Sequence, residues 1–166
     1  MTTPPNFAAM TIANMPKYWR ILAAGFAAGS LDLAYAVIAW TTQGVGPILI
    51  PQSIASGLIG SAAYQGGAAT ALLGAMLHFS MATAMAFIFY QAARRCEFIR
   101  LKPLWSGAMF GLCCYAAMNY IVVPLSAAVV SPPPGVIAIT DIAAHIFLVG
   151  IPIALFVLPQ PSTVVP

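Results

Sequence analysis

The stretch RRCEFIRLK, residues 94–102, decides the fold because it is the largest cluster of charge in a very apolar chain. It carries five of the nine charged residues, and it separates an apolar run over 68–92 from another over 104–127. Each run is as long as the roughly 20 apolar residues that a helix needs to cross a bilayer. The sequence therefore predicts two membrane-spanning helices joined by a short basic loop.

The composition of the whole chain supports the same interpretation. Of the 166 residues, 61% are hydrophobic and 5% are charged, whereas about a quarter of the residues in a soluble domain are charged. A surface that faces water cannot be built from so few charges, which excludes a soluble globular protein. The basic residues form no stripe on one face, so nucleic acid is not an expected partner. Membrane lipids are the expected surroundings.

The hydrophobic pattern predicts an all-α, polytopic membrane protein. The four expected transmembrane helices lie at about residues 20–42, 68–92, 104–127 and 136–158. They form a single domain over 20–158, with a disordered cytoplasmic N-terminus at 1–19 and a short cytoplasmic tail at 159–166. The segment 48–67 between the first two spans is rich in Ser, Gly and Ala and predicts a short helix at the outer face. This helix either lies in the interface or dips into the membrane.

Two clusters of basic residues set the expected orientation. Lys and Arg are retained on the cytoplasmic side of short loops, and the chain between the two clusters would cross the membrane twice. Both termini are therefore expected on the cytoplasmic side. The residues expected to set the topology and to contact lipid head groups are Lys17, Arg20, Arg94, Arg95, Arg100 and Lys102.

Each predicted span carries at least one strongly polar residue. The candidate intramembrane polar layer is Asp32, His78, Asn119, Asp141 and His145. At 1.5 Å per residue, four of the five lie roughly 10–15 Å from the outer ends of their spans. An acid inside a bilayer costs at least a few kcal/mol unless it is protonated, paired or hydrated, so it is a functional candidate. Asp141 and His145 are four residues apart, close enough to hydrogen-bond on one helix.

Small residues at four-residue spacing recur along several of the predicted spans. Such residues allow the backbones of two helices to approach closely. The polar residues of the layer would then point toward the packed seam between helices and away from lipid. The glycines expected at these contacts are Gly25, Gly29, Gly74, Gly107 and Gly111.

Four interpretations of the polar layer stay open. The favoured one is a network of interhelical hydrogen bonds that fixes the helix register, with no cofactor and no metal. The second is a polar or ion site, or a proton relay of Asp32 with His78 or His145, because imidazole titrates near neutral pH. The third is a haem with His78 and His145 as its axial ligands. The fourth is Cu(I) held by methionine and cysteine sulfur atoms.

The sequence predicts no enzyme and no catalytic residue, because the GxSxG, HExxH, P-loop and dinucleotide-binding patterns are all missing. The favoured hypothesis is a small non-enzymatic membrane protein that acts through helix packing. It would be an accessory or assembly subunit of a larger membrane complex, or a homo-oligomer. The alternative is a small transporter or a proton- or ion-conducting protein that uses the polar layer.

A set of short motifs over roughly residues 70–155 carries a family resemblance. The motifs are LGAMLH at 73–78, LWSG at 104–107, MNYIVVPLS at 118–126 and VGIP at 149–152, preceded by His145. In these motifs the chain resembles a group of uncharacterised bacterial inner-membrane proteins that includes the YagU-like family. The resemblance implies a multi-pass protein of the bacterial inner membrane, and it implies no activity.

Overall fold

The computed structural model describes residues 15–130 and 135–158. Over these residues every regular element is a helix and none is a strand. Four helical stretches are long and apolar enough to cross a membrane: Lys17–Thr41, Gly67–Arg95, Pro103–Leu125 and Gly135–Val157. They confirm the predicted all-α, multi-pass membrane fold. Residues 1–14 of the predicted disordered N-terminus and the whole predicted tail at 159–166 lie outside the described residues.

Two of the spanning stretches are uninterrupted helices, and two contain a π-helical turn. The uninterrupted helices are α1 (Lys17–Thr41) and α3 (Gly67–Arg95). The third span consists of α5 (Pro103–Ala117), the π turn η4 (Met118–Val122) and α6 (Val123–Leu125). The fourth consists of α7 (Gly135–Ala144), the π turn η5 (His145–Gly150) and α8 (Ile151–Val157). The shorter elements are α2 (Leu49–Ile59), the 3₁₀ helix η3 (Gly60–Gln65) and α4 (Glu97–Leu101).

Prolines mark the beginnings of two spans. The carbonyl of Pro16 accepts a hydrogen bond from the backbone N–H of Arg20 at 3.1 Å. Because this bond already closes the first helical turn, α1 begins at Lys17, three residues before the predicted start of the span. Pro103 occupies the first position of α5, where its missing N–H has no helical partner to lose. Between α3 and α5, the residues Glu97–Leu101 of the basic stretch form the short helix α4.

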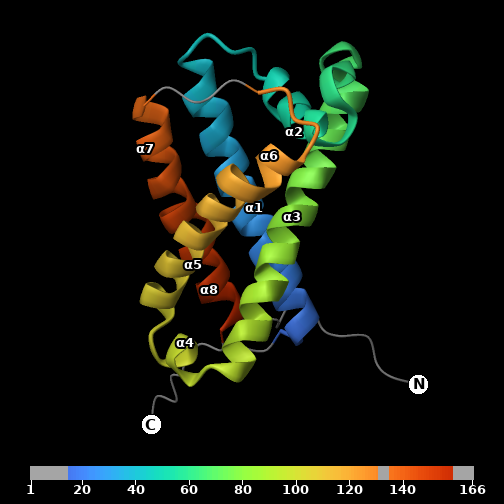
Figure 1. The fold of residues 1–166 in the computed structure, drawn as a ribbon. Coiled ribbons are helices and arrows are strands. Elements are labelled where there is room, and N and C mark those ends of the chain that lie inside the picture. The colour runs from blue at the N-terminus through green and yellow to red at the C-terminus, as the bar shows by residue number, and fades with distance from the viewer. Residues whose placement is uncertain (1–14, 131–134, 159–166) are drawn as a thin grey trace, which may run out of the picture.

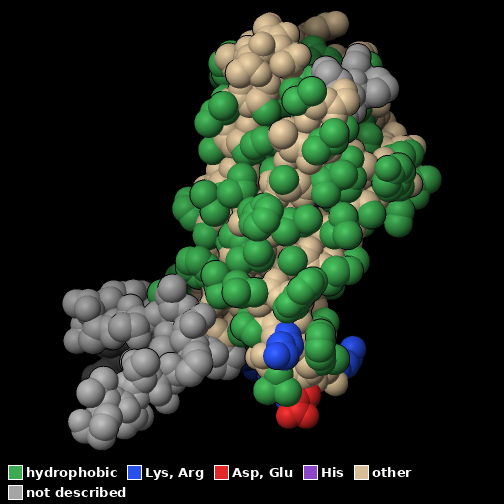
Figure 2. All heavy atoms as spheres, turned by 90° about the vertical axis from the view of Figure 1, so that its left-hand side faces the viewer, with side chains coloured by type: hydrophobic (Ala, Val, Ile, Leu, Met, Phe, Trp, Pro, Cys, Tyr) green, Lys and Arg blue, Asp and Glu red, His purple; other side chains and the backbone are tan. Residues whose placement is uncertain are grey.

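The two basic clusters lie at the same end of the bundle. In Figure 1 the beginning of α1, the helix α4 and the end of α8 lie together at the bottom, and α2 lies at the opposite end. Figure 2 shows hydrophobic side chains along the length of the bundle, with Lys and Arg side chains at its foot. We name these the basic end and the outer end of the molecule. The distribution is that of a protein whose sides face lipid and whose basic end reaches water.

The predicted packing glycines lie where helices touch. A Cβ atom added at any of Gly25, Gly29, Gly74, Gly107 or Gly111 would come within 3.0 Å of atoms in another element. At Gly25 the obstacle is the Cα atom of Thr83 at 2.5 Å, so α1 and α3 are in backbone contact there. Across the contact between the third and fourth spans, Gly111 meets the backbone of His145 and Gly150 meets that of Gly111. These contacts bring the polar residues of neighbouring spans close together.

A cluster of buried apolar side chains fills the half of the bundle near the basic end. Its members are Ala24, Ala28, Ala86, Phe89, Ala93, Val149, Ile153, Ala154, Val157 and Leu158. They come from α1, α3 and the fourth span, and most are small, which suits the close helix crossings. Phe89 is 1% exposed and packs edge-to-face on Phe110 of α5. An internal pocket lies in the other half of the bundle.

Candidate functional site

The half of the bundle near the outer end contains a pocket of about 430 Å³. Its walls come from all four spans and from α2. The five residues of the predicted polar layer, Asp32, His78, Asn119, Asp141 and His145, all line this pocket. Residues that are up to 113 positions apart in the sequence therefore share one intramembrane space.

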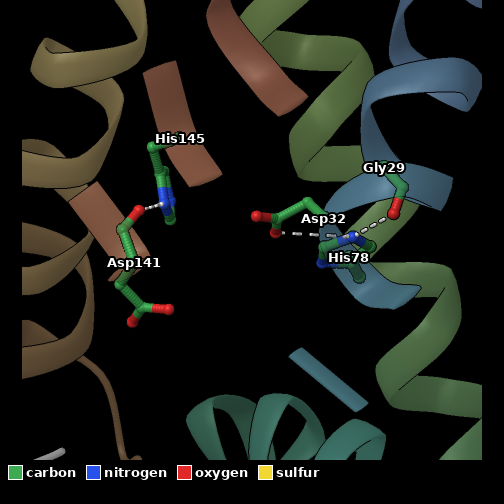
Figure 3. Close-up of polar contacts among 5 residues, drawn as sticks. All are labelled: Gly29, Asp32, His78, Asp141 and His145. Atoms are coloured by element: carbon green, nitrogen blue, oxygen red, sulfur yellow. Dashed lines mark hydrogen bonds and ion pairs between the residues drawn. The ribbon is translucent and has the colours of Figure 1, made fainter. Parts of the chain in front are cut away.

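Asp32 of α1 and His78 of α3 form one side of the pocket. The Nε2 atom of His78 lies 2.8 Å from the carbonyl oxygen of Gly29 and 4.0 Å from Oδ2 of Asp32. A carbonyl oxygen only accepts, so Nε2 carries the proton and donates it to Gly29. Figure 3 shows the carboxylate of Asp32 pointing from α1 into the space between α1 and the pair Asp141 and His145. At 4.0 Å this carboxylate is an ion-pair neighbour of His78 and not its hydrogen-bond partner.

Asp141 and His145 form the opposite side, and they hydrogen-bond to each other through the backbone of Asp141. The Nδ1 atom of His145 donates to the backbone carbonyl of Asp141 at 3.0 Å, and not to its carboxylate. In Figure 3 that carboxylate points away from the ring of His145. The two residues hydrogen-bond on one helix, as their four-residue spacing predicts, but the acceptor is the backbone carbonyl. His145 is the first residue of the π turn η5, where the ordinary α-helical geometry ends.

Asn119 is placed in a similar way by the other π turn. Its Nδ2 atom donates to the carbonyl oxygen of Tyr115 at 3.0 Å, one turn back on the same span. Asn119 lies in η4 and lines the pocket. Both π turns thus contain a polar pocket residue that bonds the carbonyl four positions earlier. π turns are rare in proteins as a whole, but those that occur are frequently found at functional sites.

Each π turn has a recognisable cause in the sequence. Pro124 and Pro152 follow the two turns, and proline has no N–H to donate to the carbonyl four residues earlier. Those carbonyls belong to Tyr120 and Leu148, which lie inside η4 and η5. The sequence analysis predicts no π turn at either proline. The signal was a polar residue five or seven positions before an intrahelical proline.

The short helix α2 closes part of the pocket near the outer end. It contributes Ser53 and Gly57 to the lining, a role that the sequence did not predict. Gln52, only 2% exposed, fastens α2 to α3 by donating to the carbonyl of Gly67 at 2.9 Å. On its other side, the carbonyl of Gly57 accepts from the N–H of Ala127 at 3.0 Å. The short helix predicted within 48–67 is present, and it forms part of the wall of the pocket.

The predicted topology residues lie away from the pocket, at the basic end. Arg20 donates from Nε to the carbonyl of Phe156 at 3.1 Å, and Arg100 donates from Nη1 to the carbonyl of Ala93 at 3.0 Å. Both carbonyls lie in the last turn of a helix, where a positive charge complements the helix dipole. The exposed members of the set are Lys17, Arg94, Arg95, Arg100 and Lys102.

The metal and haem interpretations fit the pocket less well than a polar ligand does. Within the described part of the chain, no three His, Cys, Asp or Glu residues come together in a group that could hold a metal ion. The sulfur atoms that line the pocket belong to methionines, and Cys113 and Cys114 are not among the lining residues. To bind a haem iron through Nε2, His78 would have to give up its hydrogen bond to Gly29.

Comparisons with protein-family models, with curated proteins and with solved structures find no match to this chain. The resemblance to YagU-like proteins therefore stays a prediction.

Proposed function

We propose that this membrane protein binds a small, partly polar ligand in the pocket near its outer end, as the binding step of a transport or sensing activity. A single observation carries the proposal. Five polar side chains from four membrane-crossing stretches surround one space of about 430 Å³. Concave sites lined mainly by apolar side chains, with a few convergent polar groups, are typical of small-molecule binding.

The hydrogen bonds of the layer favour this proposal over a purely structural network. A network that fixes helix register would join different helices. Among the five residues of the layer, His78 joins two spans through its bond to Gly29, and beside the layer the hydroxyl of Tyr35 in α1 donates to Oγ1 of Thr140 in α7 at 2.7 Å. His145 and Asn119 bond carbonyls of their own spans. Their polar groups are thus oriented toward the pocket without fastening one helix to the next.

Binding also fits the geometry better than conduction through an open pore. The apolar cluster around Phe89 and Ile153 fills the bundle between the pocket and the basic end. Its members are no more than 5% exposed. Ala28 and Val149 belong to this cluster and also line the pocket, so they form its floor. A conducting protein would need a second conformation in which this floor opens.

The proposal is tested by filling the pocket with a larger side chain. Met81 lines the pocket. Met76 lies on the same helix, but its side chain is 61% exposed on the outside of the bundle. We expect Met81→Trp to abolish ligand binding and Met76→Trp, the matched control, to retain it. The probes are choline, its uncharged carbon isostere neohexyl alcohol, and the tert-butylacetate anion. Binding is measured as the shift of the thermal unfolding midpoint in detergent.

Two outcomes would overturn the proposal. One is that none of the three probes shifts the unfolding midpoint of the wild-type protein. The other is that a probe stabilises Met81→Trp as much as the wild type, which would place binding outside the pocket. Stabilisation of the wild type and of Met76→Trp, with none of Met81→Trp, supports it.

The role of accessory or assembly subunit stays a separate proposal. The apolar exterior does not distinguish it, because lipid and a protein partner both require such a surface. It predicts that purification in mild detergent recovers a stoichiometric membrane-protein partner or a defined homo-oligomer. A monodisperse monomer recovered under these conditions would contradict it.

A further inference from the structure

We propose that the ligand of the pocket is a small organic cation, held between the carboxylates of Asp32 and Asp141. The inference rests on the proposed function and adds the charge class of the ligand. It follows from the inventory of charges in the pocket, from the hydrogen bonds of the two histidines and from the nature of the remaining wall.

The pocket contains acidic groups and no permanent positive charge. Asp32 enters from α1 and Asp141 from α7, and no Lys or Arg is among the lining residues. The described basic side chains gather at the basic end, beyond the apolar cluster. The only lining groups that could balance the two carboxylates are therefore His78 and His145.

Neither histidine needs a positive charge to make the contacts that the structure shows. His78 donates one N–H to the carbonyl of Gly29, and His145 donates one N–H to the carbonyl of Asp141. A neutral imidazole has one N–H and makes either bond. Even with His78 charged and paired with Asp32, the carboxylate of Asp141 has the neutral hydroxyl of Tyr35 as a hydrogen-bond neighbour and points away from the ring of His145.

An ionised carboxylate is costly inside a membrane unless it is hydrated or paired with a positive charge. Asp32 and Asp141 come from different spans and face one common space, so a single cation between them would offset both. The described residues supply no such cation within the pocket. A ligand that carries its own positive charge completes the balance.

The rest of the wall favours an organic cation over a metal ion. A metal ion needs several oxygen, nitrogen or sulfur ligands converging within about 2–2.6 Å. The described residues offer no group of three or more His, Cys, Asp or Glu side chains that could hold such an ion. The wall is instead completed by apolar side chains, including Ile54, Met85 and Val122. Such a surface suits the methyl or methylene groups of an alkylammonium ion, and about 430 Å³ leaves room for them.

The test compares the three probes that share one shape and differ in charge. We expect choline to bind the wild type at least about tenfold more tightly than neohexyl alcohol, and tert-butylacetate not to bind. Asp141→Asn should weaken choline binding by about tenfold or more and leave the affinity for neohexyl alcohol within about twofold. Asp141→Glu retains the charge and should recover part of the choline affinity. Its thermal unfolding, and that of Asp141→Asn, reports whether each variant is folded.

The results separate this inference from the proposed function. Binding of neohexyl alcohol as tight as that of choline, with loss in Met81→Trp, would overturn the cation inference and leave the pocket as a ligand site. Choline binding that is unchanged in a folded Asp141→Asn variant would also overturn it. Failure of all three probes would overturn both proposals. Preference for choline that depends on both Met81 and Asp141 supports both.

Discussion

For a carboxyl group inside a membrane, Asp32 makes weak stabilising contacts with its protein neighbours. Its nearest ion-pair neighbour is Nε2 of His78 at 4.0 Å, and that atom already donates to Gly29. The side chain of Asp32 remains 19% exposed, toward the pocket. A carboxylate that stabilises the fold would have closer hydrogen-bond or ion-pair partners. Removing those partners would then cost stability. Under the proposed function, Asp32 is instead placed to contact a ligand in the pocket.

The substitution Asp32→Asn separates these two roles. An amide costs less than a carboxylate inside a bilayer, so we expect the free energy of unfolding to rise or to stay within about 0.5 kcal/mol of the wild type. Choline affinity should fall by about tenfold or more. Unfolding in mixed micelles and binding in detergent measure the two effects. A loss of more than about 1 kcal/mol of stability with binding intact would favour the structural network.

The glycines at the helix crossings make a second residue-scale prediction. Gly111→Ala would push a Cβ atom into the backbone of His145, so the third and fourth spans would have to separate. We expect a loss of about 1–3 kcal/mol in the free energy of unfolding. Gly135→Ala is the matched control, because a Cβ atom added there meets nothing within 4 Å. Equal stability of the two variants would contradict the close packing described for Gly111.

At the scale of the elements, the two π turns position the polar residues of the third and fourth spans. A π turn inserts an extra residue into a helix, and so it changes which side chains face the centre of the bundle. η4 contains Asn119 and η5 begins at His145. Each turn includes the carbonyl that the following proline leaves without a donor. The prolines therefore shape the pocket without lining it.

Replacing one proline tests this role. In Pro124→Ala the new N–H can donate to the carbonyl of Tyr120, so we expect η4 to become α-helical and Asn119 to turn out of its present position. Choline affinity should fall while thermal stability is maintained or raised, and amide hydrogen exchange over 118–124 should slow. Pro103→Ala is the control, because Pro103 is at the first position of α5. Unchanged affinity together with slower exchange would show that the turn does not shape the site.

The elements also show how far the sequence alone leads. The four spans are predictable because charge and proline stop apolar helices, and charges such as those in 94–102 cannot enter a bilayer. The depths of Asp32 and His78 are predictable from the rise per residue. The π turns are not, because they depend on where the carbonyls freed by Pro124 and Pro152 find room in the packed bundle. The place of α2 beside the pocket depends on the tertiary hydrogen bonds of Gln52 and Gly57, which no local pattern reveals.

At the scale of the whole molecule, the bundle divides into two halves. Apolar side chains fill the half near the basic end, and the pocket occupies the half near the outer end. The positive-inside rule predicts that the basic end lies in the cytoplasm, and the pocket would then lie nearer the opposite side of the membrane. A ligand would then reach it from that side.

The native cysteines allow this orientation to be measured. Cys96 is exposed at the basic end, whereas Cys113 and Cys114 lie within the spanning helix α5. In intact bacterial cells we expect a membrane-impermeant maleimide to label Cys96 only after permeabilisation. Gln43→Cys in a Cys96→Ser background should be labelled without permeabilisation, because Gln43 is exposed near the outer end. Labelling of Cys96 in intact cells would reverse the proposed orientation.

The central claim is that the intramembrane polar layer is a ligand-binding pocket. Its most direct test is titration calorimetry of the detergent-solubilised protein with choline and with neohexyl alcohol, on the wild type, Met81→Trp and Met76→Trp. We expect saturable binding of at least one of these probes, with one molecule bound per chain, in the wild type and in Met76→Trp. We expect no binding heat for that probe in Met81→Trp. The absence of binding to the wild type, or equal binding to all three proteins, would contradict the central claim.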